Sequence, residues 1–260
     1  MKFQKIRLEF THEDRVARIT LTSPKANILD RAMIHELEAA VSHCSRRTLN
    51  AIVLAAEGHN FSFGASVQEH LPDQIAGTLQ SLHALLRRIY EAPAPVIAAV
   101  RGQCLGGGFE LALSCDLIIA DKTAQFASPE IKLAVFAPAA SALLPVRVGQ
   151  AVASRLLLTG AAITAEEAAR YGLVAKVVDD LEAGLNQWLE TDFLPRSSSS
   201  LKFACRAARL PLRRVFEQDL PEIESLYLHD LMMTPDAEEG IRAFLEKRAP
   251  QWCKPALAQT

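Results

Sequence analysis

The chain has 260 residues, of which half are hydrophobic and 22% are charged, and its formal net charge is −2. This length suits one large α/β domain, or such a domain with a smaller appendage. The balanced charge provides no excess of cations for binding a polyanion, so nucleic acid is not expected as a partner. The longest apolar stretch, 134–146, contains two prolines and is too short for a membrane span, so no membrane segment is expected.

The cysteine and histidine patterns bear on the cellular location and on metal binding. Five scattered cysteines form no CxxC pair, and the opening residues MKFQKIRLEF lack the apolar core of a secretory signal. Reduced thiols and a cytoplasmic location are therefore expected. The histidines form no HExxH motif and are expected to be exposed to solvent, so no metal is predicted. Neither of the common glycine-rich motifs for dinucleotides or ATP-type phosphates occurs.

The first part of the chain alternates strand and helix signals. β-Forming residues at 4–10 and 15–22 flank a turn and predict a hairpin. Residues 30–47 predict an amphipathic helix with an aspartate as its N-cap, and the apolar run 51–56 predicts a buried strand. The long connection that follows, 57–74, is of a kind that is often functional.

The middle of the chain continues this alternation. Helices are predicted at 73–91 and 109–115, and strands at 96–100, 117–120 and 173–178. The order ββαβαβαβ, with crossovers long enough for a helix, indicates an α/β fold rather than a sandwich or a bundle.

Three further helix signals interrupt this order. Residues 128–130, Ser-Pro-Glu, match the N-cap and first positions of a short helix or turn. The Ala- and Leu-rich segment 137–155 predicts one or two short helices broken by its prolines. A capping box at 164–167 predicts a helix that is ended by Gly172.

Beyond residue 181 the strand signals stop. Helical spacing covers 185–193, stops at the PRSSSS segment 195–200, and resumes for three helices, of which the last ends near Lys247. We therefore predict two parts, a core at 1–195 and a helical region at 196–260.

Three consecutive glycines, 106–108, connect the predicted strand 96–100 to a helix. Glycine admits positive φ and close approach of a ligand, so this turn would expose N–H groups at the positive end of a helix dipole. Such donors stabilise a developing negative charge, and Glu110 adds a carboxylate in the first turn. A tight turn whose acid only favours the helix dipole would leave the same pattern.

Addition of water to an unsaturated acyl thioester needs this kind of arrangement. The carbonyl must be polarised, one group must activate water, and another must protonate carbon. The N–H of Gly107 is one candidate donor, and that of Ala65, a small residue on the long connection 57–74, is a candidate for the second. Glu130 stands at another helix entrance, where it could equally serve the helix dipole alone.

Three separated motifs, RGQCLGGGFELALSCDLIIA, FSFGAS and QFASPEIKL, resemble the crotonase superfamily of enoyl-CoA hydratases and isomerases. The resemblance covers nearly the whole chain, and DAEEGIRAFLEKRAPQW near the C-terminus is typical of hydratases. It implies an α/β, crotonase-like spiral of ββα units with a C-terminal helical oligomerisation region, and a homo-oligomer that is a trimer or a dimer of trimers. The implied substrate is an acyl-CoA. No cofactor is implied, because coenzyme A is part of the substrate.

The resemblance also implies roles for individual positions. The two backbone amides of the family's oxyanion hole match Ala65 and Gly107. Its two catalytic glutamates match Glu110 and Glu130, which would hold and activate one water, with Glu130 as the proton donor to carbon. Further contacts with coenzyme A or the acyl group are expected at Lys25, Ala26, Asn27, Ser66, Val67, Gly106 and Phe136.

Two departures from the family pattern bear on the substrate. GASVQEH at 64–70 replaces GADIKEM, so an acidic residue is lost beside an oxyanion donor. AVFAPAASALLP at 134–145 replaces a glycine-rich segment, which predicts a more apolar acyl pocket. The combination resembles the branch of the family that hydrates cyclohexa-1,5-diene-1-carbonyl-CoA in anaerobic degradation of aromatic (benzoyl-CoA) compounds.

Other functions stay open at this point. A general enoyl-CoA hydratase, an isomerase or a thioester hydrolase would share the fold, although isomerases commonly use one carboxylate. A non-catalytic protein that binds acyl-CoA or RNA is a further alternative, and the lack of a Lys/Arg cluster disfavours RNA. His70 could contact the substrate or lie on the loop surface. Ser66 lacks the surrounding GxSxG motif of a nucleophile, so we expect it only to line the pocket.

Overall fold

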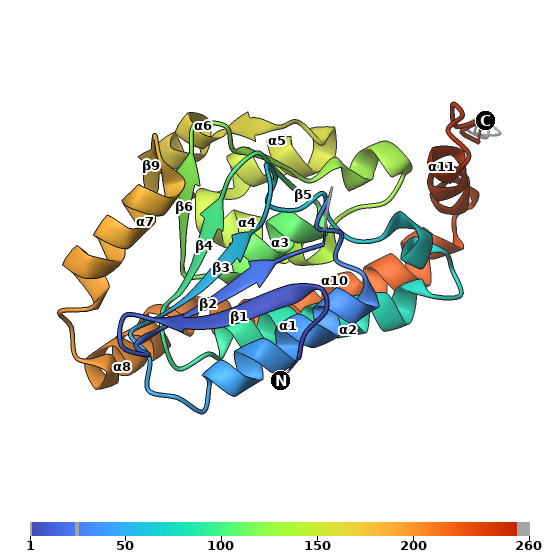
Figure 1. Ribbon diagram of the computed structural model, residues 1–260. Helices are drawn as coiled ribbons and strands as arrows, with labels where there is room; N and C mark the ends of the chain where they lie inside the picture. Colours follow the sequence, from blue (N-terminus) through green and yellow to red (C-terminus); the bar gives the residue numbers. More distant parts are fainter. Residues whose placement is uncertain (1, 24–25, 254–260) are drawn as a thin grey trace.

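The computed structural model describes residues 2–23 and 26–253, and Figure 1 shows their arrangement. Lys25, one of the residues expected near coenzyme A, lies outside the described residues. A central sheet carries helices on both faces, and the C-terminal part is helical (Figure 1). Among the residues that the structure describes, no helix has both the length and the apolar character needed to cross a membrane.

The central sheet contains six strands: β1 (Ile6–Thr11), β2 (Val16–Leu21), β3 (Ala51–Ala56), β4 (Val96–Val100), β6 (Leu117–Asp121) and β9 (Lys176–Val178). They lie in the order β1-β2-β3-β4-β6-β9. β1 and β2 form the predicted antiparallel hairpin, and the other neighbouring strands run parallel. The last strand is shorter than the predicted 173–178, because it begins only at Lys176.

Both faces of the sheet are buried at its central strands β3 and β4, whereas the edge strand β1 exposes one face. One face packs on α1 (Arg31–Cys44), α2 (Ile75–Tyr90), α3 (Gly107–Ser114) and α4 (Pro138–Val148), and the other packs on α7 (Leu181–Trp188). Successive side chains of a strand point to opposite faces, so Ile52 and Leu54 face the first layer while Val53 and Ala55 face α7. This explains why β3 is an unbroken apolar run rather than an alternating one.

A second, smaller sheet is missing from the sequence-based predictions. It consists of β5 (Gln103–Leu105), β7 (Gln125–Ala127) and β8 (Ile163–Thr164). β5 lies between β4 and α3, so the three glycines connect β5 to the helix, and the prediction that they follow β4 directly is wrong. Each turn of the chain thus places a strand in the large sheet, then one in the small sheet, then a helix: β4-β5-α3 is followed by β6-β7-α4. This is the expected ββα unit.

Predicted capping residues account for two helix starts. The side chain of Asp30 accepts a hydrogen bond from the N–H of Met33 at the start of α1. The side chains of Thr164 and Glu167 each accept from the other's backbone N–H, which forms the predicted capping box of α6 (Ala165–Arg170). Gly172 follows with φ of 76°, a conformation that glycine adopts without strain.

Two local predictions are wrong in part, and a third, the N-cap position of Ser128, is confirmed without a cap hydrogen bond. The segment 137–155 does form two helices, α4 and α5 (Gln150–Thr159), but the break falls at Gly149 and Pro145 lies inside α4. Proline costs that helix one N–H hydrogen bond, and the burial of Leu143 and Leu144 beside it holds the helix together. Ser128 occupies an N-cap position, yet its side chain makes no cap hydrogen bond. The serines at 198–200 do not interrupt the helical region but form the first turn of its first helix.

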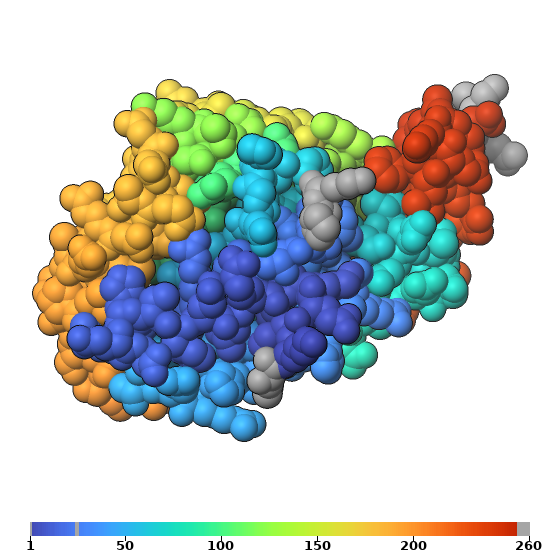
Figure 2. All heavy atoms as spheres, in the orientation of Figure 1, coloured from blue at the N-terminus to red at the C-terminus, as the bar shows by residue number. Residues whose placement is uncertain are grey.

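The C-terminal region forms three helical stretches, as expected. The first is α8 (Ser198–Ala208), and the second runs through α9 (Leu210–Arg214) and α10 (Leu220–Ser225) with intervening and following π-helical turns. The third is α11 (Pro235–Leu245), which forms a lobe at one corner of the molecule in Figures 1 and 2. It contacts the 3-10 turns Val67–His70 and Pro129–Leu133, so the C-terminal helix packs against two segments that carry predicted site residues.

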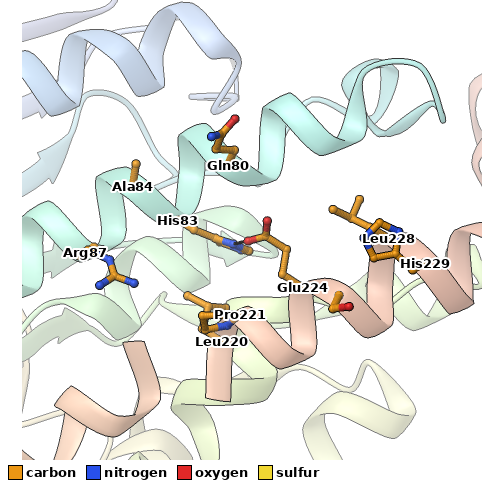
Figure 3. A pocket seen from close by; sticks show the side chains of 10 residues that line it. Gln80, His83, Ala84, Arg87, Leu220, Pro221, Glu224, Leu228 and His229 are labelled. Atoms are coloured by element: carbon orange, nitrogen blue, oxygen red, sulfur yellow. Dashed lines mark hydrogen bonds and ion pairs between the residues drawn. The ribbon is translucent and has the colours of Figure 1, made fainter. Parts of the chain in front are cut away.

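One histidine contradicts the expectation of solvent exposure. His83, on α2, is only 7% exposed, and its Nδ1 lies 2.5 Å from Oε2 of Glu224 on α10. Figure 3 shows the two side chains pointing toward each other across the space between the helices. The hydrogen bond to His83 lowers the pKa of the Glu224 carboxyl. The His83–Glu224 pair joins α2 to the C-terminal region. It borders a cavity of about 450 Å³ that shares no lining residue with the two cavities described below.

Candidate active site

The glycine turn brings a helix start against a second loop. Gly106 has φ of 51° and ψ of −125°, which only glycine adopts readily, and Gly107 is the first residue of α3. A Cβ placed on Gly107 would lie 3.1 Å from the backbone N of Ala65 and 3.2 Å from its Cβ. The two positions that match the oxyanion hole are therefore neighbours in space, although 42 residues separate them in the chain (107 − 65).

The N–H groups of Ala65 and Gly107 are available to a ligand. Gly107 opens α3, so its N–H has no acceptor inside the helix. Throughout residues 2–23 and 26–253, no oxygen atom accepts a hydrogen bond from either group. Two adjacent donors of this kind, one at the positive end of a helix, can stabilise negative charge on a carbonyl oxygen.

Ser62 fixes the loop that carries Ala65, a role that the sequence analysis missed. Its hydroxyl donates to the carbonyl of Asn27 at 2.7 Å and accepts from the N–H of Gly64 at 3.1 Å. Gly108 packs so closely that a Cβ there would lie 2.7 Å from the Ser62 hydroxyl. The motif FSFGAS contains this serine, but only the fold shows that it packs against the glycine turn.

Glu110 is buried and held in one orientation. Its side chain is on α3, and the residue is 3% exposed. Its Oε1 accepts a hydrogen bond of 3.0 Å from the N–H of Ala140, in the first turn of α4. The AVFAPAASALLP segment thus supplies a helix N-terminus to this carboxylate, which is a favourable position for negative charge.

Glu130 approaches the same place from the 3-10 turn Pro129–Leu133. A Cβ added to Gly106 would overlap its Oε1, so Gly106 makes room for this carboxyl group. Its Oε2 is buried, and none of the described protein atoms forms a hydrogen bond with it. Burial, and then the charge of Glu110, raise the pKa of Glu130 to about 8. The structure therefore brings the two glutamates together, and Glu130 retains its proton near neutral pH.

Two neighbouring cavities open at this site. The larger, of about 830 Å³, is mostly apolar, and the smaller, of about 70 Å³, contains the carboxyl group of Glu130. Five residues line both cavities: Phe63, Ala65, Val67, Pro129 and Leu133. The larger one has the size of a typical ligand pocket, and the smaller one suits a compact group next to Glu130.

The predicted contact residues distribute unequally over these cavities. Ala26, Ser66 and Val67 line the larger one, and Gly106 and His70 line the smaller one. Four predicted site residues line neither cavity: Asn27, Phe136, Gly107 and Glu110. Asn27 is 4% exposed, and its side-chain amide donates to the carbonyls of Glu57 and Asn60. Phe136 packs edge-on against the ring of Tyr227, with 5.2 Å between the ring centres.

The described residues contain no group of three or more His, Cys, Asp or Glu side chains that could hold a metal ion. All five cysteines are free. The polar groups around Glu130 include the carboxyl group of Glu110, the backbone amides of Ala65 and Gly107, and the imidazole of His70, and the larger cavity adds Ser66, Gln68, Lys132 and Arg248.

Comparison with known proteins identifies the family. A family model described as enoyl-CoA hydratase/isomerase matches residues 11–255. The chain belongs to this enoyl-CoA hydratase/isomerase family. A curated relative of this family from Thauera aromatica, named cyclohexa-1,5-dienecarbonyl-CoA hydratase, is 49% identical over 90% of the chain and 92% of its own length. A probable enoyl-CoA hydratase from Mycobacterium bovis is 36% identical over 97% of the chain and 99% of its own length.

Solved structures of the enoyl-CoA hydratase/isomerase family agree with the fold. An enoyl-CoA hydratase from Mycobacterium avium superposes with a TM-score of 0.86 at 30% identity, over 96% of the chain and 99% of that structure. The predicted α/β class and crotonase-like architecture are confirmed. With relatives named as hydratases, the chain is an enzyme of the hydro-lyase class.

The raised pKa of Glu130 predicts a pH-dependent effect of Glu130→Gln on stability. The folded protein keeps this proton up to about pH 8, whereas the unfolded chain loses it near its ordinary pKa of 4.5. The protonated group's contribution to the free energy of unfolding is therefore fully present below pH 4.5, and it is lost as the pH rises toward about 8. Glutamine cannot ionise and escapes this loss.

We therefore expect the Tm of Glu130→Gln to exceed that of the wild type by an amount that grows between about pH 5 and about pH 9, by roughly 5 °C or more. Thermal unfolding across this range measures the difference. Glu222→Gln, at an exposed position on α10, is the control. A Tm difference that stays constant with pH would contradict the proposed ionisation of Glu130.

Proposed function

We propose that this enzyme hydrates an unsaturated cyclic acyl-CoA, namely cyclohexa-1,5-diene-1-carbonyl-CoA, in anaerobic degradation of aromatic compounds. One observation carries the hydratase chemistry: the carboxyl group of Glu130 lies against Gly106 and feels the charge of Glu110, and the unpaired N–H groups of Ala65 and Gly107 lie beside the same glycine turn. The name and the 49% identity of the Thauera relative support the choice of substrate. The small cavity beside Glu130 supports a compact acyl group.

The two backbone amides act on the thioester. Hydrogen bonds from Ala65 and Gly107 to its carbonyl oxygen draw electrons from the conjugated double bonds onto that oxygen. A single donor of this type contributes about 3 kcal/mol to stabilisation of the transition state. The ring carbon that water attacks becomes electrophilic as a result.

The two carboxyl groups handle one water molecule. The Glu110 carboxylate accepts a proton from water while the water oxygen bonds to the ring carbon and the electron pair of the double bond moves toward the thioester oxygen. The Glu130 carboxyl group then donates its proton to carbon as the enolate returns to the thioester. The raised pKa of Glu130 supports the role of acid, and the hydrogen bond that orients Glu110 supports the role of base.

The larger cavity is proposed to bind coenzyme A, which enters as part of the substrate. Ala26, Ser66 and Val67 line this cavity, and Phe244 and Arg248 border it from the C-terminal side. No separate cofactor or metal takes part in the proposal. The reaction as written needs only the acyl-CoA and water.

We further propose a homo-oligomer, a trimer or a dimer of trimers, assembled through residues 196–260. Large apolar side chains on these helices are exposed in the single chain, among them Phe203 at 62%, Leu210 at 59% and Met233 at 77%. Burial of such side chains between subunits would remove apolar surface from water. Light scattering of the purified protein measures the assembly directly.

The assay for the proposed function follows the loss of conjugated absorbance when the purified protein meets cyclohexa-1,5-diene-1-carbonyl-CoA. We expect turnover, with mass spectrometry showing one atom of ¹⁸O in the product when the reaction runs in labelled water. Crotonyl-CoA, a linear enoyl-CoA, is the comparison substrate. An isomerised product without added oxygen, or no turnover on any enoyl- or dienoyl-CoA, would overturn the proposal.

A further inference from the structure

A buried tyrosine near the two glutamates has no assigned role. Tyr227 lies in the π-helical turn Leu226–Asp230 that follows α10, and it is 1% exposed. None of the described protein atoms forms a hydrogen bond with its hydroxyl group. A buried hydroxyl without a partner costs about 1 to 3 kcal/mol, so its presence in a well-packed interior calls for a reason.

The ring of Tyr227 packs beside the small cavity that contains Glu130. It belongs to a cluster of buried residues with Val135 and Ile241, and both of these line the small cavity that contains Glu130. Phe136 meets the ring edge-on at 80°, with 5.2 Å between the ring centres. The ring is thus fully packed by apolar side chains. Its hydroxyl group is the only part of the side chain that lacks a hydrogen-bond partner among the described residues.

The electrostatic surroundings keep this hydroxyl protonated. Burial raises the pKa of Tyr227 well above its ordinary value, and the charges of Glu130 and then Glu110 raise it further. Glu130 also lines the small cavity that Val135 and Ile241 of the Tyr227 cluster line. Oε2 of Glu130 is a second buried polar atom without a partner, so the same part of the molecule holds two unsatisfied groups.

We propose that Tyr227 is a third polar contact for the oxygen that the reaction adds: its hydroxyl group hydrogen-bonds to the water held by Glu110 and Glu130, and then to the hydroxyl group of the product. This inference rests on the proposed function. One oxygen atom in this place satisfies the orphaned phenol and the free carboxyl oxygen of Glu130 together. Tyr227 would therefore act on every acyl-CoA that the enzyme hydrates, and it transfers no proton itself.

The variant Tyr227→Phe tests this role, because it removes the hydroxyl and keeps the ring. A hydroxyl that serves only the added oxygen stabilises nothing in the free protein, so we expect the Tm to stay constant or to rise. The kcat for the dienoyl-CoA should fall about tenfold. The inhibition constant of cyclohexanecarbonyl-CoA, a saturated analogue that gains no oxygen, should stay unchanged.

The control is Tyr171→Phe, at a tyrosine whose hydroxyl instead accepts a hydrogen bond from Arg155 at 3.1 Å, and it should leave kcat unchanged. An unchanged kcat in Tyr227→Phe would overturn the inference. A lower Tm together with weaker binding of cyclohexanecarbonyl-CoA would also overturn it, because the hydroxyl would then be structural. If the proposed function itself is wrong, the wild-type enzyme will turn over no enoyl- or dienoyl-CoA, which is a different result from an unchanged kcat in Tyr227→Phe.

Discussion

Glu110→Gln and Glu130→Gln are each expected to lower kcat by about 100- to 10,000-fold, the usual contribution of a positioned acid or base. Glutamine keeps the size of the side chain and can still hold a water molecule, but it neither accepts a proton from that water nor delivers one to carbon. Binding of acyl-CoA should stay nearly intact, since the amides of Ala65 and Gly107 are unchanged. The loss should therefore appear in kcat and not in KM.

Steady-state kinetics on the dienoyl-CoA, with titration of cyclohexanecarbonyl-CoA to measure binding, checks this expectation. Glu222→Gln again serves as the matched control, because that glutamate is exposed on α10. The double variant Glu110→Gln/Glu130→Gln should be hardly slower than the worse of the two single variants, since both groups handle the same water. Wild-type rates in either single variant would show that the roles assigned to this pair are wrong.

Local features of the site could be predicted from the sequence because they depend on neighbours in the chain. The glycines 106–108 predicted a tight turn at a helix start, and Gly106 does adopt a positive φ before α3. Asp30 predicted the start of α1, and the apolar run 51–56 predicted β3 with its observed ends. The motif resemblance added the architecture, which the solved hydratase structures confirm.

Features that depend on tertiary contacts could not be predicted from spacing. β5, β7 and β8 have two or three residues each, too few for a periodic signal. Glu110 and Glu130 come together only if the chain folds back to the glycine turn after 20 residues (130 − 110). Only the family resemblance suggested this pairing. His83 lies on a helix with an ordinary amphipathic pattern, and only the packing of α10 shows that Glu224 buries and binds it.

A buried ion pair connects the predicted core to the predicted oligomerisation region. The guanidinium group of Arg209, between α8 and α9, forms two hydrogen bonds to the Asp116 carboxylate, at 2.7 and 2.6 Å. It also donates to the carbonyls of Ala92 and Ala94. Asp116 accepts in addition from the N–H of Val96, the first residue of β4. The side chains of Arg209 and Asp116 are 7% and 19% exposed, so the pair is largely shielded from water.

Arg209→Met is accordingly expected to lower the free energy of unfolding by about 3 to 5 kcal/mol, as for removal of one partner from a buried ion pair. Methionine fills part of the space but leaves Asp116 charged and two carbonyls without donors. Chemical denaturation with urea measures the loss. Arg213→Met is the control, because Arg213 is 65% exposed and lies 3.9 Å from Glu217, and an exposed pair of this kind contributes little.

A double variant, Arg209→Met/Asp116→Asn, separates the effect of the unpaired charge on stability from the effect of the lost packing. Asp116→Asn added to Arg209→Met removes the unpaired charge, so it should restore part of the lost stability. Because Asp116 lies two residues beyond α3, which begins at Gly107 and carries Glu110, the single variant should also lower kcat under conditions where it remains folded. An Arg209→Met protein as stable as the wild type would mean that the ion pair contributes no net stability. The C-terminal helices would then be held by apolar packing together with polar contacts such as the His83–Glu224 pair.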